Sequence, residues 1–363
     1  MINILQLISS AGIGGAETHT YQLIKGLHEH ENYHVLLACP SNGPLVDKVR
    51  ELGVEILPVE MNSKLNIVSI IKLIYYIKKK NVSIVHTHIP KADFFGGIAA
   101  IISMVPLVVT LHGDFVRDTK RNGLTMKYYK FFYRILYKKS KCIIAISNYI
   151  KQGFEDWMGK KLPKIKVIYN GSDLSRSKGG MDTNKEQDII IGNIGRLVPL
   201  KRQEDFLIAA SNILKKRNNV RFLLVGDGEL REYLEGCAEE LRIKDRFAFL
   251  GEKAATEIYP ILDILVCCSE WEGFGRVITE AMSFSKPVIA TMTGAIPEIV
   301  VDGETGILVP PRNPELLSIA IESLLDNPVK REQLGKSGYE RFQKYFTTSI
   351  FVKNTEKVFN LNN

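Results

Sequence analysis

Cysteine is scarce in this sequence, and its few copies are not arranged for metal binding or redox chemistry. The 363 residues include five cysteines, and no two of them have the C-x-x-C spacing of zinc ribbons and thioredoxin-type motifs. A disulfide-rich scaffold is excluded by the same low count. Scattered thiols suit the reducing cytosol, so we expect a cytoplasmic protein.

Long hydrophobic runs are also missing. The longest apolar stretch, residues 98–111, has 14 residues and contains Pro106, whereas a membrane-spanning helix needs about 20. The opening MINILQLISS has neither a basic n-region nor an A-x-A site, so it predicts a strand rather than a signal peptide.

The chain also has no overall excess of acidic residues. Its net charge is +8, with residues 1–170 at +11 and the remainder at −3. This asymmetry suggests two domains with different partners.

The sequence does contain a regular alternation of short β-branched runs and amphipathic stretches. Such alternation is typical of β-α-β units built around parallel sheets. The predicted strands are residues 2–9, 33–40, 55–60, 83–88, 107–113, 142–147 and 165–170, and, after a break, 188–195, 220–228, 246–251, 264–269, 286–293 and 305–311.

The break divides the chain into two predicted domains. Residues 172–187 are polar and contain glycine, as linkers do. We therefore predict two doubly wound, Rossmann-like domains over 1–171 and 188–345, and a helix over 346–363 that packs back on the first domain. Open α/β sheets bind ligands at the carboxyl ends of their strands, so the expected active site is a cleft between the domains.

The first glycine loop departs from the dinucleotide-binding fingerprint. Gly12, Gly14 and Gly15 follow the first strand, but G-x-G-x-x-G would require glycine where Glu17 stands. The second strand ends in Cys-Pro rather than in an acid that could hold a ribose, so NAD is disfavoured. Glycines here let backbone N–H groups approach a phosphate or a sugar, although a plain tight turn has the same composition.

Two pairs of charged residues in the second half suggest contacts to a diphosphate and to hydroxyl groups. Arg196 and Lys201 stand at a helix start, where cations oppose the helix dipole but can bind phosphate. Glu272 and Glu280 are eight residues apart, and we expect Glu272 at a helix start and Glu280 two turns later on the same face. Carboxylates placed there can accept bonds from ribose and sugar hydroxyls. Taken alone, each pair also fits an ordinary solvated helix.

These residues belong to an ordered series of motifs that covers nearly the whole chain. The series is GGAE (14–17), VHTH (85–88), TLHG (110–113), AISNYI (145–150), VIYNG (167–171), IGRLVPLK (194–201), LLVGDGEL (223–230), EGFGRVITEAM (272–282), KPVIAT (286–291), GAIPE (294–298) and DGETGILVPP (302–311). In this order it resembles the retaining nucleotide-sugar glycosyltransferases of family four, which have the GT-B fold. The resemblance implies hexosyl or N-acetylhexosaminyl transfer with retention, and neither a cofactor nor a metal ion.

The resemblance also implies a role for individual residues. Gly14 and Gly15 would lie by the pyrophosphate and sugar of the donor, and His112 by the transferred sugar. Arg196 and Lys201 would neutralise the diphosphate and stabilise the leaving nucleotide. Further donor contacts would come from the carboxylates of Glu272 (sugar hydroxyls) and Glu280 (ribose), from the backbone of Gly273, Phe274 and Gly275, and, near the base, from Gly251 and Glu252. The sequence has no D-x-D, the metal-binding motif of the other main glycosyltransferase fold.

Some positions depart from the family pattern or suggest other chemistry. Arg276 stands where an apolar residue is common, and we expect it to face solvent. Cys267 and Cys268 stand where Pro-Ser is frequent, and we expect them to be buried. His86 and His88 face the same side of a strand, but no third or fourth metal ligand is evident in the sequence. We therefore predict strand-end or acceptor-side roles for both histidines, and an acceptor-side role for Glu17.

A basic, aromatic segment suggests where an acceptor could be presented. Residues 117–141 hold nine Lys/Arg, one acid and six interleaved aromatic residues, and YYIKKK at 75–80 adds to them. Such a segment can lie on an anionic membrane. Nucleic-acid binding, which we do not expect, and a packed helix with a solvated basic face are the alternatives.

Together these observations predict a retaining transferase. It would move a sugar from a nucleotide-sugar donor, expected to be a UDP-sugar, to a glycan or lipid-linked acceptor in bacterial surface polysaccharide synthesis, such as lipopolysaccharide, O-antigen or capsule. Peripheral attachment to the inner face of the cell membrane is expected. The alternatives are a sugar-nucleotide epimerase or phosphorylase on the same fold, and a lipid- or nucleic-acid-binding protein without catalytic activity.

Overall fold

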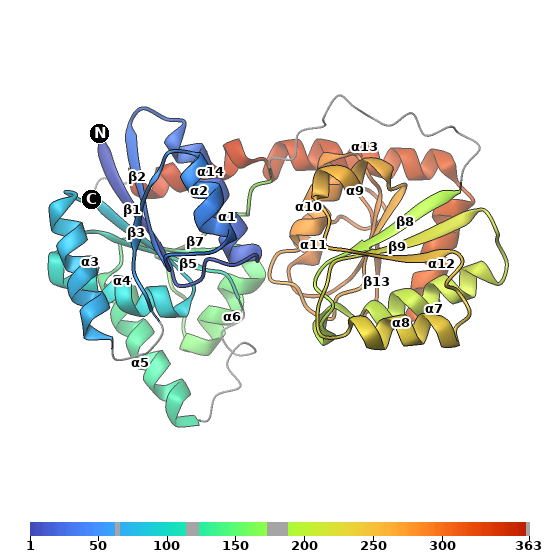
Figure 1. Ribbon diagram of the computed structural model, residues 1–363, viewed down its shortest axis with the longest axis horizontal. Coiled ribbons are helices and arrows are strands. Elements are labelled where there is room, and N and C mark those ends of the chain that lie inside the picture. The colour runs from blue at the N-terminus through green and yellow to red at the C-terminus, as the bar shows by residue number, and fades with distance from the viewer. Residues whose placement is uncertain (62–65, 114–122, 173–187, 361–363) are drawn as a thin grey trace. The chain divides into compact units, whose positions relative to one another are not determined.

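The protein forms two compact units in the computed structural model. The structure describes residues 1–61, 66–113, 123–172 and 188–360, with side chains for all of these except 123–125. The first unit comprises Met1–Gly171 together with Thr348–Asn363, and the second comprises Ser172–Thr347 (Figure 1). The predicted linker over 172–187 lies, apart from Ser172, outside the described residues. Among those residues, no helix is both long and apolar enough to cross a membrane.

The first unit is built on a seven-stranded parallel sheet in the order β3-β2-β1-β4-β5-β6-β7. Most of its strands are apolar runs rich in Val, Ile and Leu, as expected where helices cover both faces of a sheet, while β4 carries the buried polar side chains of His86, Thr87 and His88. The strands are β1 (Ile2–Ile8), β2 (Tyr33–Cys39), β3 (Glu55–Pro58), β4 (Ile84–His88), β5 (Leu107–Leu111), β6 (Cys142–Ala145) and β7 (Ile165–Val167).

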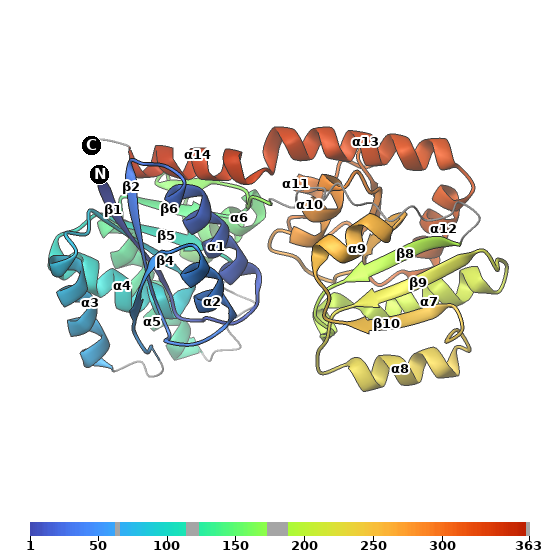
Figure 2. The same cartoon turned by 45° about the horizontal axis from the view of Figure 1, so that its top comes forward.

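Helices cover both faces of this sheet. The helices are α1 (Gly15–His28), α2 (Pro44–Glu51), α3 (Ile67–Lys79), α4 (Pro90–Ser103), α5 (Gly123–Lys139), α6 (Asn148–Met158) and α14 (Thr348–Phe359). Helices α2 and α14 both contact α1 on one face, while α3 packs against α4 on the other (Figures 1 and 2). The strand order reverses at β1, which lies between β2 and β4, and this reversal marks where an open sheet binds ligands.

The last helix, α14, completes the core of the first unit. Its residues Phe351, Val352 and Phe359 are buried in the same cluster as the β1 and α1 side chains. The Lys141 ammonium donates to the Phe359 carbonyl at 2.8 Å, which ties the end of α14 to the start of β6. Helix α14 is therefore an integral part of the first unit although it is last in the chain.

The second unit is built on a six-stranded parallel sheet in the order β10-β9-β8-β11-β12-β13. The strands are β8 (Ile189–Ile194), β9 (Val220–Val225), β10 (Phe247–Gly251), β11 (Ile264–Cys267), β12 (Val288–Thr291) and β13 (Ile307–Val309). Its helices are the 3-10 turn η1 (Pro199–Lys201), α7 (Gln203–Leu214), α8 (Arg231–Glu240), α9 (Ala255–Ile261), α10 (Arg276–Ser283), α11 (Ile296–Ile299), α12 (Pro314–Leu325) and α13 (Pro328–Tyr345). Each predicted strand of both halves is thus confirmed.

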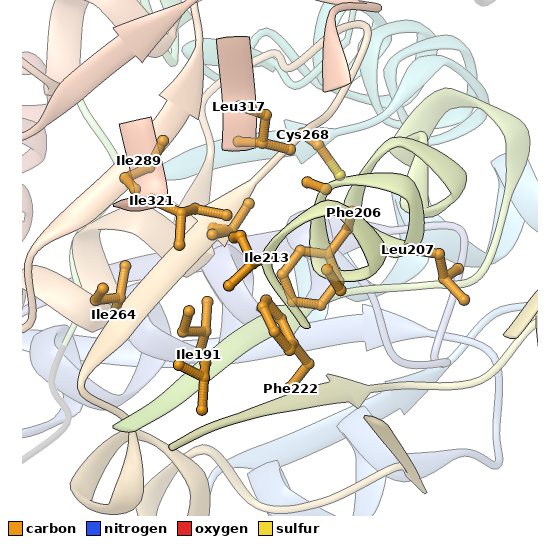
Figure 3. Packing of buried hydrophobic residues seen from close by; sticks show 14 of the residues in the cluster. Ile191, Phe206, Leu207, Ile213, Phe222, Ile264, Cys268, Ile289, Leu317 and Ile321 are labelled. Atoms are coloured by element: carbon orange, nitrogen blue, oxygen red, sulfur yellow. The ribbon is translucent and has the colours of Figure 1, made fainter. Parts of the chain in front are cut away.

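Aromatic and aliphatic side chains fill the core between this sheet and its helices. The Phe206 ring of α7 packs edge-on against Phe222 of β9, with 5.6 Å between ring centroids, and Ile191 and Ile213 lie beside them (Figure 3). Cys268 belongs to the same cluster, and Cys267 is also buried, as predicted. Strand β8 lies between β9 and β11, so the order reverses here as well, and the loops after β8 and β11 flank the expected ligand-binding point.

Candidate active site

An ion pair joins the two loops at the strand reversal of the second unit. Lys201 follows β8 in η1, Glu272 follows β11, and the Lys201 ammonium contacts Oε1 of the Glu272 carboxylate. Ser269 also donates to this carboxylate at 2.8 Å. The Lys201 side chain is 23% exposed and that of Glu272 is 13% exposed, so the pair is largely desolvated yet reachable. Two residues 71 positions apart are therefore held at one ligand-binding edge.

The charge of Lys201 is kept by its surroundings. Burial lowers the pKa of the Lys201 ammonium, but Glu272, with help from Cys267, more than offsets this and leaves the pKa above its usual value. Arg196 follows Gly195, where a Cβ atom would lie 3.8 Å from Cε of Lys201, and its charge lowers the pKa of Lys201 slightly. Arg196 is exposed, and no ion pair to it is found in the part of the chain that the structure describes. The predicted cations are brought together at an edge suited to an anion.

Glu272 does not lie at a helix start, contrary to the prediction. Helix α10 begins at Arg276, after Gly275, which has a left-handed φ of 91°. The Glu272 carbonyl instead accepts the backbone N–H of Ala295 at 2.9 Å. A Cβ atom on Gly294 would fall 2.2 Å from that carbonyl oxygen, so this close approach requires glycine. A contact from a distant loop, which helical periodicity does not encode, sets the position of Glu272.

The Glu280 carboxylate contacts two side chains, and its contact with Arg276 contradicts a prediction. Arg276 was expected to face solvent, but its side chain is 14% exposed and lies 3.3 Å from Oε1 of Glu280. The reason is the spacing of the two residues, since side chains four apart on a helix meet on one face. The hydroxyl of Tyr259 donates to Oε2 of Glu280 at 3.0 Å, and burial followed by this carboxylate raises the pKa of Tyr259 well above its usual value. The Glu280 carboxylate is thus held in one orientation.

Glycines after β9 support the loop that carries Arg196. A Cβ atom at Gly226 would lie 2.0 Å from the Gly195 carbonyl oxygen, and one at Gly228 would lie 2.5 Å from that of Leu197. Both glycines have positive φ. The Gly226 N–H also donates to the carbonyl of Gly251 at 2.8 Å, so Gly251 lies beside the same loops. The motif LLVGDGEL contains both glycines, but the sequence alone does not reveal that they pack against the loop of Arg196.

In the first unit, the glycine loop leads directly into α1. Helix α1 starts at Gly15, and Gly14 precedes it in extended backbone, with φ −174°. The Glu17 carboxylate lies close to this helix start: a Cβ atom at Gly14 would be 2.5 Å from Oε2 of Glu17. An anion at a helix N-terminus interacts favourably with the helix dipole. A dinucleotide-binding loop has its third glycine at this position, whereas this chain has the carboxylate of Glu17 there.

Four of the seven histidines of the first unit, His19, His86, His88 and His112, form a largely buried group. His86 bonds through Nε2 to the Thr110 hydroxyl at 2.7 Å, and His88 bonds through Nδ1 to Nε2 of His112 at 3.1 Å. His86 and His88 have no exposed surface, which does not fit direct acceptor-side contacts. Burial, followed by neighbouring imidazoles, lowers the pKa of both well below the usual value, so both rings are neutral. Sequence reasoning did not find His19, whose ring lies 4.5 Å from that of His112.

Comparison with known proteins shows which family this chain represents. Residues 13–176 match the model described as Glycosyltransferase Family 4, and residues 181–341 match that of Glycosyl transferases group 1. The uncharacterized glycosyltransferase MJ1178 of Methanocaldococcus jannaschii is 30% identical over 96% of this chain and 94% of its own length. The chain belongs to glycosyltransferase family 4. The predicted family is thereby confirmed, and so is the prediction that the protein is a glycosyltransferase.

Two further similarities of this family-4 glycosyltransferase are to a bacterial galactosyltransferase and to solved structures. The UDP-Gal:alpha-D-GlcNAc-diphosphoundecaprenol alpha-1,3-galactosyltransferase of Escherichia coli is 30% identical over 80% of this chain and 78% of its own length. Crystal structures of Anabaena HepE with UDP and with UDP-glucose superpose with TM-scores of 0.87 and 0.86, at 22% identity and 99% coverage of both chains. The predicted GT-B fold is confirmed.

Proposed function

We propose that this glycosyltransferase moves a hexosyl or N-acetylhexosaminyl group from a UDP-sugar to a lipid-linked or glycan acceptor, with retention and without a metal ion. The observation that carries the proposal is the desolvated Lys201–Glu272 pair with Arg196 beside it. The Escherichia coli relative, named for UDP-Gal and a diphosphoundecaprenol acceptor, and the UDP-bound HepE structures support the donor and acceptor classes. Surface polysaccharide synthesis in the bacterial cytoplasm is the proposed setting.

The proposed chemistry needs stabilisation of the leaving group. When the bond from the anomeric carbon to the phosphate oxygen breaks, negative charge develops on the diphosphate. Arg196 and Lys201 would neutralise that charge as fixed cations in a partly desolvated site, where such interactions are strongest. In this arrangement Lys201 exchanges part of its contact with Glu272 for the diphosphate.

The carboxylates would position the donor. Glu272 would accept bonds from sugar hydroxyls, and Glu280, already oriented by Tyr259 and Arg276, would accept those of the ribose. The remaining proposed donor contacts are backbone groups of Gly273, Phe274, Gly275, Gly251 and Glu252, and, from the first unit, Gly14, Gly15 and His112.

Retention follows if the acceptor oxygen attacks from the face that the diphosphate leaves. The new bond joins the anomeric carbon to the acceptor oxygen, and the acceptor proton passes to the departing phosphate oxygen. Atoms and charge then balance without a protein nucleophile, a cofactor or a metal ion.

Donor binding is the first test of this proposal. Thermal shifts are measured with UDP-, GDP-, ADP- and dTDP-sugars, each with and without EDTA. Stabilisation by UDP-sugars that EDTA leaves unchanged is the expected result, worth about 2.7 kcal/mol at 100 times Kd. Lys201→Met and Arg196→Gln should each weaken UDP binding roughly 10- to 150-fold, the range for one charged hydrogen bond. Lys215→Met, at an exposed lysine of the same unit, is the matched control. Equal UDP affinity in all three variants would contradict the proposed diphosphate site.

We also propose that α3 attaches the first unit to an anionic membrane. Helix α3 buries Leu73 and Ile77 but exposes another apolar stripe, with Ile67 at 64%, Val68 at 71%, Ile71 at 60% and Tyr75 at 54% exposure. A helix normally turns its apolar side chains to the core. Exposed lysines flank the stripe at 72, 78 and 79, and α5 adds exposed apolar side chains at 128, 131 and 135. Apolar residues bordered by cations suit an anionic lipid surface.

Vesicle sedimentation tests this attachment. The triple variant Ile67→Ser, Val68→Ser and Ile71→Ser should lose binding to vesicles containing phosphatidylglycerol, while Ile319→Ser, at an exposed apolar residue of the second unit, should retain it. Neither variant touches the proposed donor site, so UDP binding should be unchanged. Full retention of vesicle binding by the triple variant would rule out α3 as the attachment surface.

A further inference from the structure

All seven histidines lie in the first unit, and four of them, His19, His86, His88 and His112, gather together, whereas His28, His30 and His34 are exposed. Within the group, one ring nitrogen each of His19, His88 and His112 lies within 4.8 Å of the others. The three residues come from α1, from the end of β4 and from the residue after β5, which is the neighbouring strand. Separate rigid elements thus converge on one point at the carboxyl edge of the sheet.

Hydrogen bonds on the outer side of two rings fix which nitrogen faces inward with a lone pair. Nδ1 of His19 lies 2.7 Å from Oδ1 of Asn170, and Nε2 of His88 lies 2.8 Å from Oε1 of Gln6. An amide oxygen only accepts, so each of these nitrogens carries its hydrogen, and in a neutral ring the opposite nitrogen carries the lone pair. For His88 that opposite nitrogen, Nδ1, is the one that faces His112, and for His19 the opposite nitrogen, Nε2, is buried. Histidines that bind metals are oriented by outer amide or carboxylate oxygens in the same way.

The spacing of two of the rings also suits a cation. The hydrogen in the contact between Nδ1 of His88 and Nε2 of His112 belongs to His112, so an ion that binds both nitrogens requires the other tautomer of His112. Nδ1 of His88 and Nε2 of His112 are 3.1 Å apart. Two ligands of a tetrahedral Zn²⁺ with bonds of about 2.0–2.1 Å are roughly 3.3 Å apart, so this pair needs little adjustment. An all-imidazole set favours Zn²⁺, Co²⁺ or Ni²⁺ over Mg²⁺ or Ca²⁺.

We propose that His19, His88 and His112 form a binding site for one divalent transition-metal ion, with Zn²⁺ preferred and the fourth position open. His112 is the least buried of the three. The site is separate from the stabilisation of the leaving group, which the Arg196 and Lys201 cations serve. One consequence rests on the proposed function: if His112 contacts the transferred sugar, Zn²⁺ and the sugar compete for it, and Zn²⁺ inhibits transfer.

Zn²⁺ binding is measured by calorimetry on the full chain, freed of metal with EDTA and then dialysed, with no donor present. One Zn²⁺ per chain is expected for the wild type. His112→Gln removes a ligand at the least buried position and should lower the affinity at least 100-fold. Asn170→Ser leaves all three ligands but removes an outer partner, and should lower it 10- to 100-fold. His28→Gln and His34→Gln, both at exposed histidines, and Cys237→Ser, at the least buried thiol, should change nothing.

The visible spectrum of the Co²⁺-loaded protein provides a second readout. Wild-type protein should develop ligand-field bands that His112→Gln lacks, and circular dichroism identifies any variant that fails to fold. Absence of saturable Zn²⁺ binding by the wild type, or equal affinity in His112→Gln, would overturn the proposed site. Because this titration contains no donor, its failure would leave the proposed transfer reaction untouched, and a failed UDP titration would leave the metal site untouched.

Discussion

Gly26→Ala should destabilise the first unit even though alanine is the better helix former. Gly26 lies in α1 against α14, and an added Cβ atom would fall 2.4 Å from Cγ2 of Val352. Val352 cannot simply rotate away, because a β-branched side chain in a helix has one strongly preferred rotamer. Relief therefore requires α1 and α14 to move apart, or their neighbours in the buried cluster to repack.

The magnitude comes from two opposed effects. Replacing glycine by alanine in a helix interior stabilises it by about 0.8–1 kcal/mol. Forcing an extra carbon into a packed core costs about 1–3 kcal/mol. Gly153→Ala in α6 isolates the first effect, because a Cβ atom there would meet nothing within 4 Å. We expect Gly153→Ala to stabilise the unit by about 1 kcal/mol, and Gly26→Ala to be less stable than that control by about 1–3 kcal/mol.

Urea unfolding followed by fluorescence can report on the first unit alone. The protein has two tryptophans, Trp157 in the first unit and Trp271 in the second, so Trp271→Phe leaves a single reporter. Val352→Ala removes the clashing methyl groups, and in a double-mutant cycle it should recover at least 1 kcal/mol of the Gly26→Ala loss. Additive effects of the two substitutions, or equal stabilisation by Gly26→Ala and Gly153→Ala, would refute the proposed contact.

Three other substitutions test separate features. Burial raises the pKa of Asp93 to about 7, so below that pH the folded state holds a proton that the unfolded state has lost, and this group should stabilise the protein by about 2–3 kcal/mol more at pH 5 than at pH 8, at 1.36 kcal/mol per pKa unit. The buried His86 and His88, whose pKa values are lowered, act in the opposite direction over this range, so the test is the difference in unfolding free energy between wild type and Asp93→Asn in urea titrations at the two pH values, which should change by this amount. Ser147 caps α6 by accepting the N–H of Ile150 at 3.1 Å, so Ser147→Ala should cost about 1–2 kcal/mol in the Trp157 assay, and Ser147→Asp should retain most of the stability. Gly294→Ala should weaken UDP binding by displacing Glu272, whereas Gly303→Ala, also at positive φ but with open space around it, should cost only about 1–2 kcal/mol of stability; equal UDP affinity in both would contradict the role of Gly294.

The fold could be predicted from the sequence because its signals are local. Buried parallel strands are short apolar runs bounded by turn residues, and the order of these runs already indicates two sheets. The site could be predicted only in part, because its contacts join distant residues. The Lys201–Glu272 contact spans 71 positions and the His88–Gln6 contact spans 82, and no local pattern encodes either.

The sequence could have corrected the prediction for Arg276 but not the prediction for Glu272. Arg276 and Glu280 are four residues apart, and this spacing alone indicates a pair on one helix face. The loop position of Glu272, by contrast, depends on the backbone of Gly294 and Ala295 passing within contact distance. Such an approach is decided by the packing of whole loops, so an E-x7-E pattern could not reveal it.

The return of α14 to the first unit has a consequence for how the protein is made. The ribosome synthesises β1–β7 first, but the helix that fills their buried cluster emerges only after the entire second unit. The second unit is contiguous, so it can close on itself while the apolar face beside α1 is still uncovered. A nascent chain thus carries an exposed hydrophobic surface through roughly half of its translation, and this surface is a natural target for chaperones.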